Sequence, residues 1–540
     1  MKRTKSKIIQ NISKIVVFIF IIFGGFICCR EENPLIPDLE EIPDQEEIPD
    51  SDSTENVYYG LEGWAAKTVG GQGGQIIKVT NLNASGSGSL ADALQSLDKR
   101  VVVFEVGGIV DLQGGTIRIE NPFITVAGQT APSPGITLIN GTIGIGTHDV
   151  LLQHLRMRVG AAWYGAGWEP DGISAISASN VVIDHCSISW AVDENCSASG
   201  PRFEGLTPDD WRSNTSNNIT MSNNIIAEGL SNATHGKGEH SKGSLIHDNT
   251  SNIAVLKNLY ISNMERSPLI KGGAQVVVAN NYIHNPGTMC IRYALNSNEW
   301  EGHSPQIGRL SIVGNVLQYG PSTASIPLLR ATGGVCKIYL KDNVAKDQNG
   351  LDVTQYIGDA SNIVKAPPIW NDNLELYSTD EVQDYIVVHA GATPWDRDET
   401  DTRLINEMLS GGGKIIDYET EVGGYPTATP TARSFDSDDW NMNFMIAISP
   451  NLSVSTPSVA DTVMQKETFA VQVEAAELTE EVEFVELLVN QRSLGKQLYS
   501  PYEWQVQPDS LGRYNLLVIA ETKKGRLWAS ETVKKVVVSK

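Results

Sequence analysis

Apolar and polar positions alternate in a nine-residue phrase that recurs between residues 180 and 345. Its six copies are NVVIDHCSI from Asn180, NITMSNNII from Asn218, NIAVLKNLY from Asn252, QVVVANNYI from Gln275, RLSIVGNVL from Arg309 and KIYLKDNVA from Lys337. Alternation with period two predicts a short β-strand in each copy. Successive copies lie 23 to 38 residues apart. This spacing is typical of a solenoid in which each repeat adds one coil.

The seventh position of the phrase is the most regular one. It holds Cys186 in the first copy and asparagine in the next five, namely Asn224, Asn258, Asn281, Asn315 and Asn343. Stacked coils would align these side chains as an internal ladder that satisfies backbone groups at the corner of each coil. Fainter copies precede the six at 123–126 and 150–152, and the coils are expected to continue to about Val364. The chain is therefore predicted to be all-β, with a right-handed parallel β-helix.

Segments around the repeats have other patterns. A short helix from Ser89 to Leu97 is predicted to cap the open end of the coil. The excursion Ala198 to Ser216 is predicted to be a loop beside the groove, and it carries the acidic doublet Asp209-Asp210. Further on, a second helix is predicted to end at Gly411 and to pack back along the coil through one face, formed by Leu404, Ile405, Met408 and Leu409.

Beyond Pro450 the pattern changes to alternating strands at 469–473, 482–489, 502–506, 514–519 and 533–538. Five strands separated by turn residues within about 90 positions predict a small β-sandwich. It resembles bacterial immunoglobulin-like modules. A role as a spacer and a weak sugar-binding role are both consistent with its sequence.

The N-terminus has the features of a secretion signal. Lys2, Arg3, Lys5 and Lys7 precede an apolar run, Ile15 to Ile27, which is too short for a comfortable membrane span and ends at Cys28 and Cys29. It resembles a bacterial lipoprotein signal, which implies lipidation of Cys29 (or Cys28) after cleavage. An ordinary signal peptide or an uncleaved anchor is the alternative.

An acidic, proline-rich segment follows, with the triplicated IPDLEE, IPDQEE and IPDSD. Such a composition predicts a solvated tether, and it resembles the tether of Bacteroidetes surface lipoproteins. The predicted parts are a signal peptide (1–29), a tether (30–57), a β-helix domain (58–448) and an Ig-like sandwich (449–540). We expect a monomer on the outer membrane, exposed at the cell surface, or otherwise a secreted or periplasmic protein.

Net charge and cysteine spacing argue against two classes of function, nucleic-acid binding and zinc binding. The formal net charge of −23 argues against binding to nucleic acid. An acidic substrate would need a metal ion or a local basic strip to complement it. Cys186, Cys196, Cys290 and Cys336 lack the CxxC spacing of zinc sites.

The repeat register also brings distant charges together. Asp193 lies seven residues after Cys186, and Arg266 lies eight after Asn258. Both residues therefore leave the coil on the same side, two coils apart, or roughly 10 Å at about 4.8 Å per coil. An acidic site and an arginine facing one groove indicate an active site rather than packing.

Several motifs in this register resemble the pectate lyases of polysaccharide lyase family 1. They are GWAAKTVGGQGG, VTNLNASGSGSLADAL, ITVAGQTAP, DGISAISASNVVIDHCSIS and ERSP, in that order. The resemblance extends from Gly60 to about Gly424. Within the family's Ile-Asp-His motif, Val182 stands where a tryptophan is usual, and Asp184 and His185 are interpreted as structural.

The resemblance implies a role for each matched residue. Asp171 and Asp193 match calcium-binding aspartates, Lys242 matches a lysine that holds a substrate carboxylate, Arg266 matches the catalytic arginine, and Lys271 stands where a second substrate-binding arginine is common. The family's third acid, four residues before Asp193, is Ser189 here. Glu194 or the neighbouring loop would compensate for the missing acid as a source of calcium ligands, or the site binds calcium less tightly without it.

The implied reaction is calcium-dependent β-elimination of polygalacturonate. Hard oxygen ligands suit Ca²⁺, the lysines would stabilise developing negative charge, and Arg266 would take the proton from C5. Since the ordinary pKa of arginine exceeds about 12, we expect an alkaline optimum. Two alternatives stay open: a polygalacturonase-type hydrolase on the same fold, for which Asp209-Asp210 is the nearest doublet, and a non-catalytic surface protein that binds glycans.

Overall fold

The computed structural model describes residues 58, 60–456, 459–475, 478, 481–490, 492–523 and 526–539. The predicted signal peptide, the tether and both candidate lipidation sites, Cys28 and Cys29, lie outside the described residues. None of the helices in the described part of the chain is long and apolar enough to cross a membrane.

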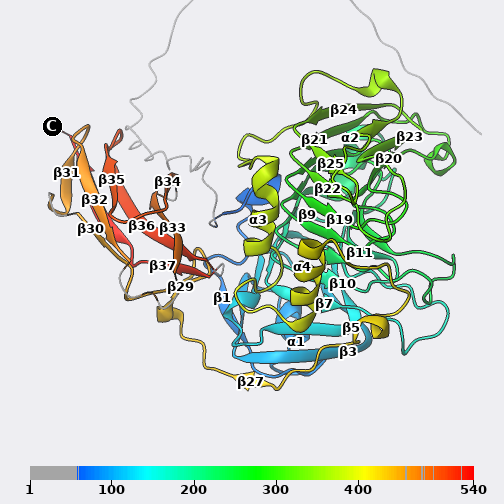
Figure 1. Ribbon diagram of the computed structural model, residues 1–540. Helices are drawn as coiled ribbons and strands as arrows, with labels where there is room; N and C mark the ends of the chain where they lie inside the picture. The colour runs from blue at the N-terminus through cyan, green and yellow to red at the C-terminus, as the bar shows by residue number, and fades with distance from the viewer. Residues whose placement is uncertain are drawn as a thin grey trace, which may run out of the picture. The chain divides into compact units, whose positions relative to one another are not determined.

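The larger part of the described chain winds into coils that stack along one axis (Figure 1). Each coil adds one strand to a ten-stranded sheet in which every pairing is parallel. Its strands, in order, are β1 (Gln75–Val79), β2 (Arg100–Phe104), β4 (Ile124–Ala127), β6 (His148–Gln153), β9 (Ser179–Asp184), β12 (Asn217–Ser222), β15 (Ser251–Leu256), β18 (Gln275–Ala279), β21 (Gly308–Val313) and β24 (Cys336–Lys341).

The same coils build two further parallel stacks. The second stack contains β7 (Leu155–Arg158), β10 (Ser187–Ser189), β13 (Ile225–Ala227), β16 (Leu259–Ile261), β19 (Tyr282–His284), β22 (Val316–Gln318) and β25 (Val344–Lys346). The third contains β8 (Ile173–Ile176), β11 (Glu194–Ser199), β14 (Lys242–Ile246), β17 (Leu269–Lys271), β20 (Ile291–Ala294), β23 (Leu329–Thr332) and β26 (Tyr356–Ile357). The long strands β3 (Val106–Ile119) and β5 (Ile136–Ile145) join the two stacks, and β27 (Thr431–Ala432) pairs antiparallel with β3.

The predicted asparagine ladder is present and continuous. The Oδ1 atom of Asn258 accepts hydrogen bonds from the backbone N–H and the side-chain Nδ2 of Asn224, at 2.9 and 3.0 Å. In the same way, the Oδ1 atom of Asn281 accepts from the N–H and Nδ2 of Asn258 at 3.0 and 2.9 Å. The Oδ1 atom of Asn315 accepts from the N–H and Nδ2 of Asn281 at 3.1 and 2.9 Å. Each side chain thereby satisfies buried polar groups that would otherwise cost free energy at the corner of a coil.

Apolar side chains fill the inside of the coils. One column of the first sheet aligns Val181, Ile219, Ile253 and Val276 in register, and each of the four is fully buried. Stacked β-branched side chains pack well on a pleated sheet. The predicted fold class, an all-β protein with a parallel β-helix, is therefore confirmed.

The helix predicted at the start of the coil is confirmed as α1 (Leu90–Gln95), with the Ser89 side chain as its N-cap. The prediction of a loop at 198–216 is wrong in part, because α2 (Pro208–Asn214) forms there. Thr207 caps α2 by accepting from the Asp210 N–H, and the Asp210 carboxylate accepts the Thr207 N–H in return. This capping box is a local signal that the interpretation as a loop overlooked.

Two helices after the coils, α3 (Thr379–His389) and α4 (Glu399–Ser410), pack on the second stack. The predicted end of α4 is confirmed, since Gly411 adopts a left-handed conformation there. Leu404, Ile405 and Met408 are buried as expected, but Leu409 is 50% exposed, so its assignment to the packed face is wrong. The sequence analysis did not identify α3. The short 3-10 helices are η1 (Trp64–Lys67), η2 (Gly128–Thr130), η3 (Ser297–Trp300), η4 (Ala360–Asn362), η5 (Glu419–Val422) and η6 (Ser437–Asp439).

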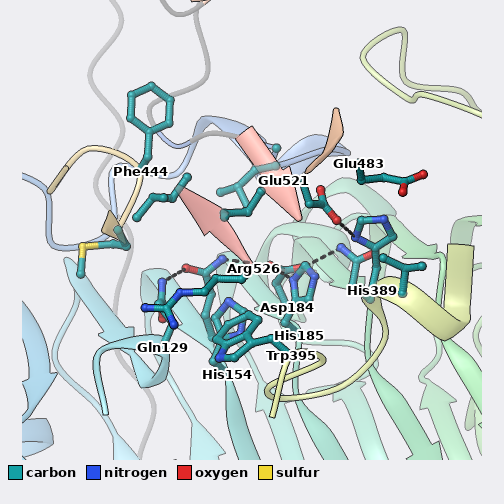
Figure 2. A pocket seen from close by; sticks show the side chains of 18 of the residues that line it. Gln129, His154, Asp184, His185, His389, Trp395, Phe444, Glu483, Glu521 and Arg526 are labelled. Carbon is teal, nitrogen blue, oxygen red and sulfur yellow. Dashed lines mark hydrogen bonds and ion pairs between the residues drawn. The ribbon is translucent and has the colours of Figure 1, made fainter. Parts of the chain in front are cut away.

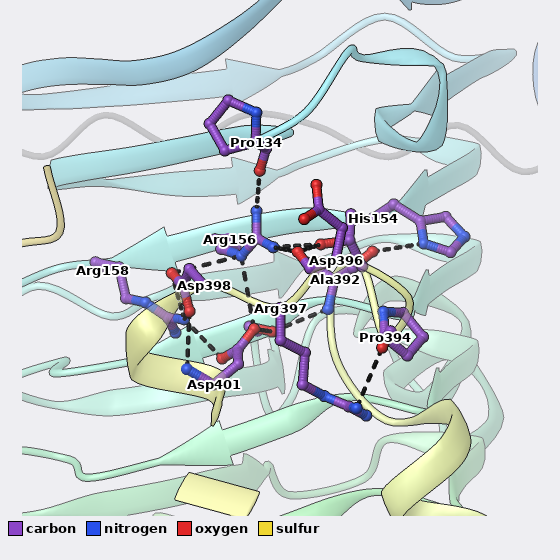
Figure 3. A network of polar contacts seen from close by, with 12 residues as sticks. Pro134, His154, Arg156, Arg158, Ala392, Pro394, Asp396, Arg397, Asp398 and Asp401 are labelled. Atoms are coloured by element: carbon purple, nitrogen blue, oxygen red, sulfur yellow. Dashed lines mark hydrogen bonds and ion pairs between the residues drawn. The ribbon is translucent and has the colours of Figure 1, made fainter. Parts of the chain in front are cut away.

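A buried ion-pair network, which we call the clasp, holds α4 against β7 (Figure 3). It consists of Arg156, Arg158, Asp398 and Asp401. Arg158 donates to Asp401 at 2.6 Å and to Asp398 at 3.2 Å, and the Arg156 Nε lies 3.5 Å from Asp398. The Asp401 carboxylate also accepts from the Ser187 hydroxyl at 2.6 Å. The clasp confirms that this helix packs back on the coil.

The C-terminal part is a separate set of strands. One sheet contains β28 (Trp440–Asn441), β29 (Ile446–Ile448), β31 (Thr462–Met464), β33 (Val482–Val489), β34 (Arg492–Gln497), β36 (Gly512–Thr522), β37 (Leu527–Ala529) and β38 (Val533–Val538), and the other contains β30 (Ser453–Ser455), β32 (Phe469–Glu474) and β35 (Tyr502–Val506). All five predicted strands are present. Apolar side chains of both sheets share one core, as in an Ig-like sandwich. The four boundaries drawn from the sequence stay predictions.

Candidate functional site

Three successive coils present four of the predicted site residues along one edge of the third stack. Asp193 and Glu194 stand at the start of β11, Lys242 begins β14, and Arg266 precedes β17. Glu194 is in register with Lys242, which forms a bridge with Glu265 on the next coil. Asp193 and Arg266 are thus two coils apart, as the repeat register predicted.

Asp171, Asp193 and Glu194 form an acidic cluster whose ligand atoms lie within 4.8 Å of one another. Asp171 enters it just before β8 and accepts hydrogen bonds from Ser197 at 3.0 Å and from the Glu194 N–H at 3.1 Å. Burial raises the pKa of Asp171 to about 6. Three carboxylates this close repel one another unless a cation lies between or beside them.

The donor set of the acidic cluster fits calcium. Carboxylate oxygens are the ligands that Ca²⁺ prefers, at about 2.3–2.6 Å, and a separation within 4.8 Å allows three such oxygens to share one ion. Ser189, which stands in place of the family's third acid, is fully buried, and its hydroxyl accepts from Arg158 in the clasp at 3.1 Å. It therefore does not face the cluster, whereas Glu194 does.

Arg266 lies against the acidic cluster. Its guanidinium forms an ion pair with Glu194, and its Nη1 lies 3.9 Å from the Asp193 Oδ1. Burial lowers the pKa of Arg266, and the nearby charge of Arg292 lowers it further. The charges of Asp193 and Asp171 act in the opposite direction, but the pKa of Arg266 is lowered overall. The direction suits a side chain that has to accept a proton.

Lys242 is neutralised in part by a neighbour. Its ammonium forms an ion pair with Glu265, and the other oxygen of that carboxylate lies 3.8 Å from Arg292. Although Glu265 is adjacent to Arg266 in the chain, its carboxylate contacts Lys242 and Arg292 instead. Two cations therefore share one acid at this point of the groove.

Lys271 lies at the opposite end of β17 from Arg266 and belongs to a second group of charges. Its Nζ lies 2.6 Å from Glu299, which also accepts from Arg202 at 2.8 Å. Arg202 in turn donates to Asp248 at 2.9 Å. Arg266, Lys271 and Glu299 line one cavity of about 520 Å³, so the two groups of charges face the same space. The structure thus brings all six predicted residues to one side of the coil.

A pair of histidines beside Asp193 was not assigned to the site from the sequence. The rings of His235 and His240 stack with centroids 3.7 Å apart, and the His240 Nε2 lies 2.7 Å from the Asp193 Oδ1. The His235 Nε2 lies 3.7 Å from both Asp193 and Glu169. Burial lowers the pKa of His235, and so does the neighbouring His240. The sequence feature that could have indicated them is the presence of two histidines, five positions apart, in the loop before Lys242.

Asp184 and His185, interpreted as structural, lie elsewhere on the coil, at the end of β9. Figure 2 shows His154, His185 and Trp395 grouped around Asp184. Asp184 accepts hydrogen bonds from four side chains: His185 at 2.8 Å, Gln153 at 2.9 Å, Ser222 at 2.7 Å and Asn223 at 2.9 Å. A carboxylate so fully engaged with neighbouring coils supports the structural interpretation.

Sequence comparison identifies relatives over most of the chain. A protein of Emericella nidulans named "Probable pectate lyase C" is 31% identical over 413 residues, which are 74% of this chain and 87% of the relative. A protein of the same name from Neosartorya fischeri is 31% identical over 388 residues, or 70% of this chain and 83% of the relative. Residues 450–518 match the family described as Bacterial Ig domain.

Solved structures give a more distant likeness. The cedar pollen allergen jun a 1 aligns with a TM-score of 0.44 and 17% identity, covering 61% of this chain and 92% of the allergen. A Bacillus subtilis pectate lyase mutant aligns with a TM-score of 0.42 and 14% identity, covering 61% of this chain and 96% of that enzyme.

Proposed function

Because the chain belongs to the pectate lyase family and is a polysaccharide lyase, we propose that it cleaves polygalacturonate by calcium-dependent β-elimination, leaving unsaturated oligogalacturonides. The observation that carries the proposal is the position of Arg266 beside the acidic cluster, with Lys242 on the coil between them. This arrangement supports the proposal of a base, a metal site and a cation on one edge of the groove.

The proton to be removed is on C5 of a galacturonate residue, next to a carboxylate. Calcium held by Asp171, Asp193 and Glu194 would withdraw charge from that carboxylate and acidify the proton. Arg266 takes the proton, and the electron pair of the C5–H bond forms the C4=C5 double bond. The C4–O bond breaks, and the leaving oxygen takes up a proton. Lys242 stabilises the negative charge that develops on the way.

A hydrolase is the weaker interpretation. Hydrolysis on this fold would need two carboxyl groups placed as general acid and base across a glycosidic bond. Asp210 instead caps α2 through hydrogen bonds from the Leu206 and Thr207 N–H groups at 2.9 and 2.8 Å, and the Asp209 side chain is 99% exposed. Neither carboxyl group of the doublet is held in the groove.

The test follows ultraviolet absorbance of the unsaturated product from polygalacturonate, with calcium and with a chelator. Asp193→Asn removes a proposed calcium ligand, and Asp209→Asn is the matched control at the exposed doublet. We expect absorbance with calcium only, a rate at least about tenfold lower for Asp193→Asn at limiting calcium, and no change for Asp209→Asn. New reducing ends without absorbance would indicate a hydrolase, and binding without either product would indicate a glycan-binding protein.

We also propose that the protein is anchored by a lipid at Cys29 (or Cys28) and acts as a monomer at the cell surface, as the lipoprotein-like signal and acidic tether suggest. Metabolic labelling with a fatty acid tests the anchor. Label in the full chain that disappears in a Cys28→Ser/Cys29→Ser variant is the expected result, and an unlabelled chain would contradict it.

A further inference from the structure

The coil before Asp193 carries the most exposed tryptophan of the described chain, Trp163. It lies in the loop 159–172, which connects β7 of the second stack to β8 of the third. Asp193 and Arg266 lie in the corresponding connections of later coils, so Trp163 leaves the coil on the same side as the groove. Trp163 is 77% exposed, whereas every other tryptophan in the described residues is buried or half-buried.

The loop around Trp163 is held by contacts at its base and in its middle. The N–H groups of residues 161–162 donate to the two carboxylate oxygens of Glu419, each at 3.0 Å, and Glu419 is fully buried. Further along the loop, the ring of Tyr164 stacks on Trp168, with centroids 4.0 Å apart and an angle of 12° between the planes. The loop therefore presents the exposed indole from a fixed backbone.

The end of the same loop contacts the acidic cluster. The Pro170 carbonyl accepts hydrogen bonds from the N–H groups of Val192 and Asp193 at 3.1 and 3.2 Å. The Gly167 N–H donates to the Thr234 carbonyl at 2.8 Å, in the segment that carries the two histidines. The loop thus extends the groove from the acidic cluster toward the N-terminal end of the coil.

An indole at this position offers the substrate a contact of a different kind. The acidic cluster, Lys242 and Arg266 act on carboxylates through charge. A galacto-configured ring also has an apolar face, because its axial C4 hydroxyl leaves the hydrogens of C3, C4 and C5 together on the other side. The face of an indole is large, apolar and electron-rich, so it suits these hydrogens. Tryptophan is also enriched among residues that contribute most to binding.

We propose that Trp163 is a substrate-binding residue that stacks on the C3–C4–C5 face of a galacturonate residue, at least one unit away from the cleaved bond. The inference rests on the proposed function and deepens it, because it adds recognition of the sugar ring to recognition of the carboxylates. Trp163 contacts no reacting atom. It therefore stabilises the bound substrate and the transition state equally, which lowers KM and leaves kcat unchanged.

The test compares Trp163→Ala with the parent enzyme on polygalacturonate, followed by absorbance of the unsaturated product. We expect KM to rise about fivefold, as for the loss of one aromatic contact, with kcat within about twofold. Trp163→Phe keeps an aromatic face and should have a KM within about twofold of the parent. Leu206→Ala removes an apolar side chain that is 96% exposed in the insertion before α2, and it should change neither constant.

Ionic strength separates a stacking contact from a charged one. Between about 0.05 M and 0.5 M salt, the ratio of KM in Trp163→Ala to KM in the parent should stay constant, whereas the same ratio for Lys271→Met should fall toward one. An unchanged KM in Trp163→Ala, a Trp163→Phe variant as impaired as Trp163→Ala, or a Trp163→Ala ratio that falls with salt would overturn the inference and leave the lyase reaction in place. A parent enzyme that releases no unsaturated product would instead overturn the proposed function, and with it the inference.

Discussion

The clasp and the groove both contain ion pairs between arginine and carboxylate side chains, but these pairs differ in their exposure to solvent. In the clasp, Arg158 and Asp401 are completely buried. In the groove, the Arg266 and Asp193 side chains are 21% and 27% exposed. A buried ion pair costs several kcal/mol to desolvate and is then strongly destabilising to break, whereas a partly exposed pair can exchange its partner for a ligand. Burial, rather than charge, separates the structural arginines from the candidate catalytic one.

The largest effect on stability is expected at the centre of the clasp. Asp401→Asn leaves Arg158 buried with only Asp398 to neutralise it, so the free energy of unfolding should fall by about 3–5 kcal/mol. Urea denaturation followed by tryptophan fluorescence measures the loss. Glu399→Gln, exposed in the first turn of the same helix, is the control and should cost less than about 1 kcal/mol. Equal losses would mean that the clasp is not what holds α4.

The apolar face of α4 also contributes to the free energy of unfolding, and it does so without any charged group. Substitutions there separate the effect of burial from the effect of charge. Leu404 is fully buried against the second stack and Leu409 is half exposed. Leu404→Ala should therefore lower the free energy of unfolding by about 2–4 kcal/mol, and Leu409→Ala by about 0.5 kcal/mol or less. Thermal unfolding of the two variants side by side would separate these values, and a larger loss for Leu409→Ala would contradict the packing described for the helix.

The smallest effect at neutral pH concerns His154, which contributes to the pH dependence of stability only as the solution is acidified. Burial and the neighbouring His185 lower the pKa of His154 to about 3, although Asp184 and the hydrogen bond to Ala392 act in the other direction. In the unfolded chain its pKa is about 6.5, so the unfolded state binds the proton first as pH falls. The free energy of unfolding should decrease by up to about 1.4 kcal/mol per pH unit from about pH 6.5 to pH 3.

Urea midpoints measured across this pH range test the role of His154. His154→Gln, which retains a side-chain N–H donor, should remove part of the pH dependence. A slope identical to that of the parent would show that other groups control acid unfolding.

The asparagine ladder and the two-coil spacing of Asp193 and Arg266 could be predicted, because both follow from a repeat that is local in sequence. The clasp could not, since Arg158 and Asp398 are 240 positions apart and no periodicity links them. The pairing of Lys271 with Glu299 was missed for a related reason. Glu299 lies in the short 3-10 helix η3, in the insertion after β20, where the register of the coil no longer fixes the direction of a side chain.

The helices α2 and α3, which lie outside the repeated strands, were also not predicted from the sequence. α2 begins at a capping box that the abundance of proline and aspartate concealed, and α3 shows only two fully buried apolar residues, Val382 and Ile386. A weak apolar stripe gives little signal for a helix whose position is set by the surface beneath it.

The most direct measurement compares Arg266→Ala with Arg158→Ala, one arginine from each region, in calcium-dependent release of unsaturated product and in thermal unfolding. We predict that Arg266→Ala lowers kcat by about 10³-fold or more and leaves Tm within about 2 °C of the parent. Arg158→Ala should lower Tm by more than about 5 °C and, below its Tm, retain kcat within about threefold. An Arg266→Ala variant that still releases unsaturated product at the parent rate would contradict the assignment of Arg266 as the base.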